Sequence, residues 1–239
     1  MPVKTDYQSR NFILHNFFLL LLAFAAGISY SAGTTAEYPL RAVGDTILAL
    51  SDDRQITRVE VTRSKPIYVY AVTGKTVSFP LEVVRKVVCD MDQYTFSHIM
   101  TRIDSLCREP AGSGRPVYFV EVGGSFMAAA LYLGVFDSSG IDPQSGSDIR
   151  FEHYADSALF KKCRSAIKAM IKVEPRDFSL GWRLRSINQT TTRVVLISRL
   201  SLNMWIPQWL YNLTAKFLYP GVVQDLEKYL IKTYGKKQE

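Results

Sequence analysis

One stretch near the end of the chain, "IPQWLYNLTAKFLYPGVVQDLEKYL" (residues 206–230), decides how the rest of the sequence is interpreted. Apolar residues recur along it at spacings that place them on one face of an α-helix: Ile206, Leu210, Leu213, Phe217, Leu226 and Leu230. Because proline removes a backbone donor and clashes with the preceding turn, we expect a kink or a break near Pro220. The stretch predicts a long amphipathic helix that closes the chain.

The aromatic residues of this helix allow three roles, and the sequence leaves all three open. Leu213, Phe217 and Leu226 suit packing against a core. Trp209, Leu213 and Phe217 suit the wall of a ligand cavity. The aromatic rings with polar tips suit contact with a bilayer, and these are Trp205, Tyr211 and Tyr219.

Two strands precede the helix, at residues 179–188 and 190–202, joined by the turn "NQT". In the second strand alternate residues share one face: Val194, Leu196, Ser198, Leu200 and Leu202. We expect this face to look inward, toward the terminal helix.

Alternating or β-branched patterns predict further strands at residues 55–61, 66–78, 97–109 and 148–155. Residues 115–136 begin as a strand, and "FMAAALYL" (126–133) suits either a helix or a long buried strand, of which we favour the strand. Amphipathic helices are predicted at 79–94 and at 156–174, the latter capped by Asp156. Residues 138–148 have the composition of a loop. Strands that surround a long terminal helix indicate an α+β protein.

Composition excludes some classes of protein. The 239 residues are 47% hydrophobic, enough for a well-buried core, and we expect one domain over residues 38–235. The net charge of +7 is spread along the chain instead of forming a basic stripe, so we predict no nucleic-acid partner. A basic surface of this kind favours transient contact with anionic membranes.

The first residues have the pattern of an export signal. Lys4 and Arg10 precede an apolar run of 12 residues from Phe17 to Ile28, followed by small residues. The run is shorter than the roughly 20 residues that span a bilayer comfortably. We therefore predict a signal peptide over residues 1–32, with an uncleaved N-terminal anchor as the alternative, and an exported protein that is periplasmic or secreted.

No set of residues points to catalysis, a metal or a cofactor. Cys89, Cys107 and Cys163 show no metal-binding spacing; one pair of them forms a disulfide, or all three are small buried residues. His98 and His153 are the candidates beyond residue 32 for a general acid or base near neutral pH. No nucleophile elbow, carboxylate pair or phosphate-binding glycine loop accompanies them. We predict no catalytic residues, no metal and no cofactor.

Three stretches resemble the START-like superfamily, whose helix-grip fold is shared by lipid-transfer domains, polyketide cyclases and plant allergens. The segment 77–98 is similar to the helix after the first long strand of that family, through Pro80, Val84, Asp90 and Tyr94. The segment 181–202 resembles its tryptophan strand and the strand that follows, through Trp182, Thr192 and Val194. The segment 206–230 resembles its terminal helix.

The likeness covers about residues 66–234 and is strongest to START lipid-transfer domains, because "GDTILALSDDRQITRVEV" (44–61) resembles their first strand pair. The sequence departs from the family in two places. A helical segment (160–177) stands where the family has a short turn, and the alanine-rich segment 124–134 is less polar than usual.

The resemblance implies a helix-grip fold in which a curved antiparallel sheet wraps around the terminal helix and encloses a hydrophobic cavity. It implies a lipid or sterol-like ligand that is bound without catalytic groups, with transport of this ligand between membranes as a further role. Polar side chains suited to orient a head group are Tyr132, Arg183 and Arg193. The residues expected to line the cavity are Tyr132, Trp182, Leu196, Leu200, Trp209, Leu213 and Phe217.

Two other functions stay open. The first is an enzyme similar to a polyketide cyclase or aromatase, which requires that His98, His153, Tyr132 or an arginine converge inside the cavity. The second is a structural domain whose interior is filled by its own side chains.

Overall fold

The computed structural model describes residues 44, 46–47, 49–50, 54–62, 66–108, 114–123, 127–142, 146–202 and 207–235. Its strands are β1 (Ile56–Val61), β2 (Val69–Val77), β3 (Met100–Arg108), β4 (Pro116–Gly123), β5 (Met127–Asp142), β6 (Gly146–His153), β7 (Ile171–Lys172), β8 (Pro175–Asn188) and β9 (Thr191–Leu202). Its helices are α3 (Leu81–Cys89), the short 3-10 helix η1 (Met91–Phe96), α4 (Ser157–Ser165) and α5 (Gln208–Tyr234).

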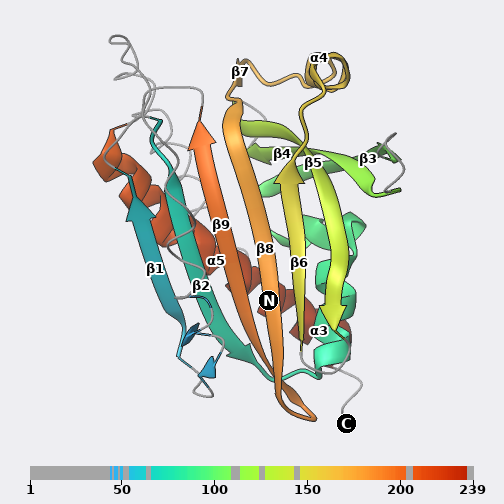
Figure 1. Cartoon of the computed structure of the whole chain (residues 1–239), viewed down its shortest axis with the longest axis vertical. Helices are drawn as coiled ribbons and strands as arrows, with labels where there is room; N and C mark the ends of the chain where they lie inside the picture. Colours follow the sequence, from blue (N-terminus) through green and yellow to red (C-terminus); the bar gives the residue numbers. More distant parts are fainter. Residues whose placement is uncertain are drawn as a thin grey trace, which may run out of the picture.

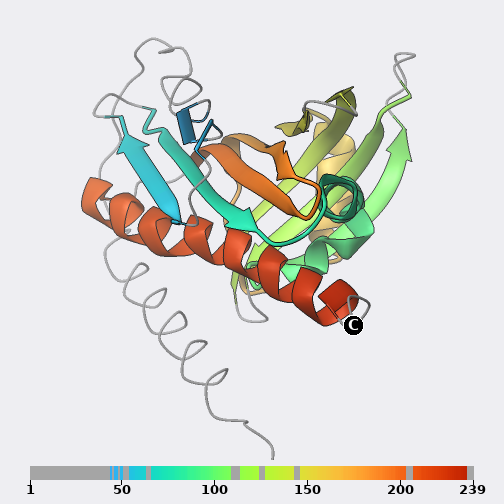
Figure 2. The same cartoon turned by 90° about the horizontal axis from the view of Figure 1, so that it is seen from below.

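The strands form one nine-stranded sheet in the order β1-β2-β9-β8-β6-β5-β4-β3, with β7 paired to β5 off this path. Neighbours along the path are antiparallel, and β7 runs parallel to β5. The sheet curves strongly, and α5 lies across its open side, with α3 and η1 beside it (Figures 1 and 2). We call the side of the sheet toward α5 the inner face and the opposite side the outer face.

The hairpin of β8 and β9 forms the middle of this sheet, as the sequence predicts. The side chain of Asn188 accepts a hydrogen bond from the Thr190 backbone N–H at 2.9 Å, which shapes the turn. Both faces of β9 are buried: Leu196 packs inward toward α5, and Val195 packs outward with Ile47. A strand buried on both faces has apolar residues at consecutive positions, which explains the run "VVLI".

The helix predicted after β2 is confirmed as α3 followed by η1. Pro80 occupies the N-cap of α3, and the apolar face of the helix is buried: Leu81, Val84, Val87 and Val88. The side chain of Asp90 accepts from the Asp92 backbone N–H at 3.1 Å and starts η1. Tyr94 then packs beneath the sheet, with its hydroxyl donating to the Val88 carbonyl at 2.7 Å.

The region 115–155 is more regular than its composition suggests. The preference for a strand at 126–133 is confirmed, but the chain reverses before it, so that β4 and β5 form an antiparallel pair. The loop predicted at 138–148 is wrong, because β5 extends to Asp142 and β6 begins at Gly146. Glycine, serine and aspartate are turn formers, yet the paired strand continues through them on both sides of the hairpin tip.

The helix predicted at 156–174 is shorter than expected. Its cap is confirmed, since Asp156 Oδ1 accepts from the Leu159 backbone N–H at 2.8 Å. The helix ends at Ser165, and Ile171 and Lys172 then pair with β5. Ile167 and Ala169 are buried against the outer face of the sheet. This packing holds the chain extended after Ser165, against the local helical pattern.

Two further expectations differ from the structure. The segment 44–61 is no hairpin, because Ile47 and its described neighbours are helical and β1 pairs with β2 instead. The terminal helix is confirmed as α5, but it continues without a break through Pro220. The predicted signal segment lies outside the described residues. Within the described part of the chain, no helix is both long and apolar enough to span a membrane.

Candidate functional site

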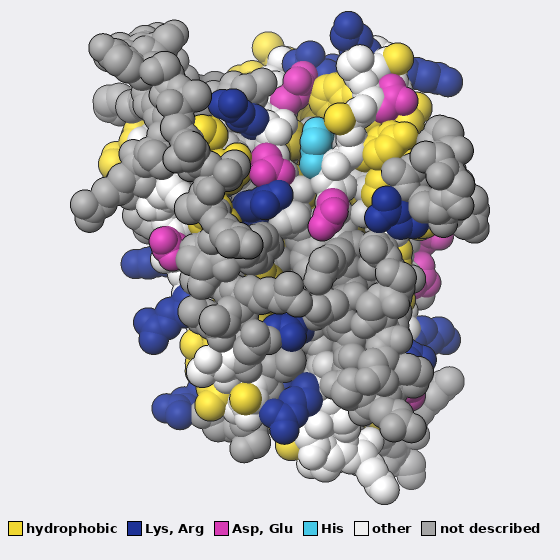
Figure 3. Space-filling model, in the orientation of Figure 1, with side chains coloured by type: hydrophobic (Ala, Val, Ile, Leu, Met, Phe, Trp, Pro, Cys, Tyr) yellow, Lys and Arg dark blue, Asp and Glu magenta, His cyan; other side chains and the backbone are white. Residues whose placement is uncertain are grey.

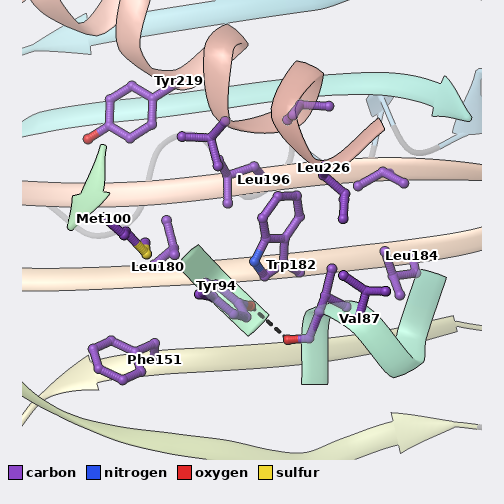
Figure 4. Close-up of a cluster of buried hydrophobic side chains, with 14 of the residues drawn as sticks. Val87, Tyr94, Met100, Phe151, Leu180, Trp182, Leu184, Leu196, Tyr219 and Leu226 are labelled. Carbon is purple, nitrogen blue, oxygen red and sulfur yellow. Dashed lines mark hydrogen bonds between the residues drawn. The ribbon is translucent and has the colours of Figure 1, made fainter. Parts of the chain in front are cut away.

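The inner face of the sheet and α5 enclose the largest apolar cluster of the described chain. Strands β2, β8 and β9 contribute one wall, α3 and η1 a second wall, and α5 the cover (Figure 4). Its members on the central strands are Val69, Ala71, Phe178, Leu180, Trp182, Leu184, Val194 and Leu196. Burial of this apolar area supplies most of the free energy that holds α5 on the sheet.

The second half of α5 is the part that the described contacts hold in place. Its buried side chains are Tyr219, Val222, Val223, Leu226 and Leu230. Polar contacts surround them: Gln55 Nε2 donates to the Pro220 carbonyl at 3.1 Å, and Gln224 Nε2 donates to Gln55 Oε1 at 3.0 Å.

Two ion pairs add to these contacts. Lys75 Nζ lies 2.5 Å from Glu227 Oε2, and His98 is paired with Asp225. In the first half of the helix, Trp209 and Lys216 are exposed, and most of the other side chains of that half lie outside the described residues.

Two hydroxyl groups form a hydrogen bond inside the apolar cluster, and a third, on Tyr132, is buried near Tyr219. Ser198 Oγ and the Tyr219 hydroxyl form a hydrogen bond of 3.0 Å, and both side chains are buried. Burial raises the pKa of Tyr132 far above its ordinary value, and the neighbouring Tyr219 raises it further. Tyr132 therefore stays protonated, and a serine or tyrosine hydroxyl can both donate and accept a hydrogen bond. We call Tyr132, Ser198 and Tyr219 the hydroxyl cluster.

A second polar point in this interior is the indole of Trp182, which is 1% exposed. Its Nε1 faces the Tyr94 hydroxyl (Figure 4), with which it makes at most a poorly aligned hydrogen bond, and Nε1 has no other acceptor among the described residues. Burial raises the pKa of Tyr94 well above its ordinary value, and the nearby Trp182 opposes this rise only in part. A buried donor without a full partner is uncommon in native proteins and is a natural contact for an oxygen atom of a ligand.

The structure brings together three of the seven residues predicted to line a cavity. Tyr132, Trp182 and Leu196 are buried in the cluster, and Leu200 packs against it partly buried. Trp209 differs from the expectation: it is 62% exposed on the first turn of α5. The side chains of Leu213 and Phe217 lie outside the described residues.

Two residues of the hydroxyl cluster are not recognisable as site residues from the sequence. Alternation along β9 predicts that Ser198 faces inward but assigns it no role. The sequence allows Tyr219 to contact a bilayer, whereas its side chain is 5% exposed inside the cluster. The signal that finds Ser198 is a single hydroxyl in an otherwise apolar inward-facing row, from Val194 to Leu202.

The two arginines considered for a head group face away from this interior. Arg193 is fully buried on the outer face, where Nε donates to the Ile47 carbonyl at 3.1 Å and Nη1 donates to Thr76 Oγ1 at 3.1 Å. Arg183 lies directly opposite Val195 in the β8–β9 ladder and shares its outward face. Neither guanidinium is placed to contact a ligand beneath α5.

The histidines do not converge with Tyr132. His98 lies at the junction of η1 and β3 and contacts Asp225 on α5. His153 is exposed at the end of β6, where partial burial lowers its pKa and the charge of Asp177 opposes that shift. Among the described residues, no group of three or more His, Cys, Asp or Glu side chains is placed to hold a metal ion. The described interior is thus apolar with a few hydroxyls and lacks an acid–base pair.

Solved structures similar to this chain share its arrangement at low sequence identity. Human STARD10 is 12% identical, with a TM-score of 0.54, and the match covers 88% of this chain and 86% of that one. The lipid transfer and protein localization domain of human StarD13 is 11% identical, with a TM-score of 0.53, and the match covers 82% and 98%. The aromatase/cyclase Zhui from Streptomyces sp. R1128 is 15% identical over 69% and 85%, and its TM-score of 0.39 carries no argument.

No family model and no curated protein matches the sequence. The assignment therefore stands on the fold. A curved antiparallel sheet closed by a long C-terminal helix is common to this chain and to the two human structures with the higher TM-scores. The chain has a START-like α+β fold of the helix-grip type.

Proposed function

We propose that this protein binds a lipid or sterol-like molecule between the inner face of the sheet and α5. One observation carries the proposal: the hydroxyl cluster and Trp182 Nε1 are buried within an apolar interior that α5 covers. Binding sites for small hydrophobic molecules are mostly apolar with a few oriented polar groups. Each methylene group removed from water contributes about 0.8 kcal/mol, so such a site needs no charged residue.

The hydroxyl cluster is suited to the polar end of such a ligand. Tyr132, Ser198 and Tyr219 can donate to a carbonyl or accept from a hydroxyl without a change of protonation. A hydroxyl, ester or ketone fits this chemistry, and a fully ionised head group does not, because no buried cation on the inner face is described to pair with it. The ligand class is therefore neutral and mildly polar at one end.

The packed interior requires that something move to admit the ligand. We assign this movement to the first half of α5, because Pro220 inside the helix removes one backbone hydrogen bond between its two halves. Exposed Trp209 lies on the moving part. The cyclase alternative gains no support, since the described histidines lie away from Tyr132.

We also propose that residues 1–32 direct export and that the mature domain works outside the cytoplasm or at its membrane. The support is the pattern of Lys4 and Arg10 before a 12-residue apolar run. Carriage of the ligand between membranes follows from the combination of export with a buried binding site.

Native mass spectrometry of the purified protein tests the binding proposal directly. We expect a bound lipid-sized mass, or saturable binding of a fluorescent sterol or acyl probe. A matched pair of variants locates the site, because Leu196 and Ile197 are adjacent, buried and on opposite faces of β9. L196A changes probe affinity, whereas I197A costs similar stability and leaves affinity unchanged. Absence of both a bound mass and saturable binding contradicts the proposal and favours a structural domain with a filled interior.

A further inference from the structure

A second feature lies on the outer face, in the segment that departs from the START-like pattern. We call it the α4 surface and define it by Lys161, Lys162, Lys168, Met170 and Lys172. It lies toward the end of the molecule where β8 begins (Figure 1). It shares no residue with the site beneath α5.

The α4 surface is held in a fixed orientation by its own packing. Ile167 and Ala169 are buried against the outer face of the sheet, so the intervening Lys168 and the following Met170 point to solvent. Backbone hydrogen bonds of 3.0 and 3.1 Å join Val173 to β5. Met170 is 79% exposed, the highest exposure among the large apolar side chains described.

The same residues border a pocket of about 430 Å³. It is lined by Lys161, Arg164, Ser165, Ala169, Met170 and Lys172. Lys172 Nζ donates to the Arg164 carbonyl at 3.0 Å and so covers the C-terminal end of α4 with positive charge. The pocket therefore combines cationic donors with one apolar side chain.

Charge on this segment is not balanced locally. Residues 156–174 carry five basic side chains and two carboxylates. Both carboxylates are engaged, since Asp156 caps α4 and Glu174 pairs with Arg164 at 3.0 Å. Among the described residues, no carboxylate forms an ion pair with Lys161, Lys162 or Lys168. Figure 3 shows Lys and Arg side chains along this end of the molecule, with hydrophobic and some acidic side chains between them.

We propose that the α4 surface docks the protein onto bilayers that contain anionic phospholipids. Lys161 and Lys168 contact the phosphate groups while Met170 enters the boundary between head groups and acyl chains. Two interactions hold peripheral proteins on membranes: attraction of basic side chains to an anionic leaflet, and insertion of apolar side chains at the interface. The choice of a membrane over an acidic protein rests on the exposed apolar side chain of Met170. Docking itself does not depend on the proposed function. Only its biological role, delivery of the ligand to a membrane, rests on that function.

Co-sedimentation of the full chain with vesicles tests this inference without any ligand. The vesicles are phosphatidylcholine alone and phosphatidylcholine mixed in equal parts with phosphatidylglycerol. We expect binding to the mixed vesicles that weakens as salt is raised. K161Q/K168Q should bind them about 25-fold more weakly, from about fivefold per lysine near an anionic surface. M170Q should bind about tenfold more weakly, because a buried apolar side chain is replaced by a polar one.

The matched control is K86Q/K232Q, which removes the same charge from exposed positions on α3 and α5. Its vesicle binding should stay within about twofold of the unmodified chain. The apolar run at Phe17–Ile28 is present in every variant and contributes equally. Hydrogen exchange should show vesicle-dependent protection of residues 161–172. Unchanged binding of K161Q/K168Q, or an equal loss in K86Q/K232Q, overturns the inference.

Failure of this inference is distinguishable from failure of the proposed function. Probe binding in the absence of vesicles reports on the site beneath α5 and should be the same for K161Q/K168Q and the unmodified chain. If the α4 surface fails its test while the probe still binds, the ligand site stands and the docking surface is wrong. If no probe binds while vesicle binding follows the expected pattern, the docking surface stands and the ligand site beneath α5 is wrong.

Discussion

Asp225 on α5 accepts two hydrogen bonds from His98, one from the backbone N–H at 3.0 Å and one from ring Nδ1. The residues are 127 positions apart in the chain. Gly221, one turn earlier on the helix, makes this contact sterically possible, because a Cβ there would lie 2.6 Å from His98 Cε1. The pair fastens the second half of α5 to the junction of η1 and β3.

Replacement of Asp225 by alanine should lower the free energy of unfolding by about 1–3 kcal/mol, since it removes two hydrogen bonds to a carboxylate whose side chain is 14% exposed. Burial raises the pKa of Asp225, but the hydrogen bonds and charge of His98 outweigh burial, and Lys228 adds to them, so the net shift is downward. Urea unfolding at neutral pH measures the loss. E82A is the control, because Glu82 forms an exposed pair whose removal should cost less than about 1 kcal/mol.

The lowered pKa of Asp225 also predicts a pH dependence. A carboxyl group whose pKa is lower in the folded state stabilises the fold above its unfolded pKa, and this contribution is lost as the pH falls through the folded value. The unmodified chain should therefore lose stability more steeply than D225A below about pH 4. Parallel stability curves for the two proteins between neutral pH and pH 3 would contradict this role.

Hydrogen exchange across α5 should separate its two halves. Residues 219–230 carry the buried side chains and the described polar contacts, so their amides should exchange slowly. Residues 208–218 should exchange faster, because an opening of the first half does not require the loss of those contacts. A bound ligand should slow exchange in the first half more than in the second. Equal protection of both halves from exchange would exclude the first half of α5 as the part that moves to admit the ligand.

The hydroxyl cluster should determine ligand affinity. Y219F removes the partner of Ser198 Oγ and should weaken a probe that carries a hydroxyl or carbonyl by about fivefold to tenfold, the cost of about one hydrogen bond. Y70F is the matched control, since Tyr70 is a buried tyrosine on the outer face. A hydrocarbon probe without polar atoms should be nearly indifferent to Y219F. Equal losses for the polar and apolar probes would point to a packing defect instead.

Gly134 on β5 should tolerate no side chain while Phe151 keeps its place. A Cβ on Gly134 would lie 1.9 Å from Phe151 Cε1, so the ring must move. This ring packs edge-on against Tyr132 at 5.5 Å between centroids, next to the hydroxyl cluster. G134A should cost about 1–3 kcal/mol as an overpacked core position. Thermal unfolding measures this loss of stability. In the double variant G134A/F151L, the smaller side chain at position 151 should recover part of it. If the losses of the two single variants simply add, the clash is not the cause.

Local patterns predict most of the elements. Strands β1, β2, β3, β6, β8 and β9 and helices α3 and α5 follow from alternation or helical spacing, because burial of one face imposes a period on the sequence. The fold class follows from their order. Errors fall where a neighbouring element overrides the local pattern: Ile167 and Ala169 pack on the sheet and end α4 early, and pairing carries β5 and β6 through residues that favour turns.

The candidate site is less visible in the sequence than the fold. Trp182 and Leu196 could be placed on the inner face from alternation alone. Tyr219 could not be assigned to the interior, because its hydrogen bond to Ser198 depends on how α5 lies on the sheet. The outward direction of Arg193 likewise depends on the packing of Ile47 against the outer face.

The sequence by itself therefore determined the spacing of apolar residues in each helix and strand, the order of these elements and the START-like fold class. These properties depend on residues that are neighbours along the chain. Only the tertiary structure decided that Asp225 meets His98, that Tyr219 is buried beside Ser198 and that Met170 stands exposed among lysines. These contacts depend on the angle at which α5 crosses the sheet and on where the segment after α4 packs. Residue spacing carries no information about this angle or this packing. The terminal stretch 206–230 therefore predicts a helix but not which of its aromatic side chains face the interior.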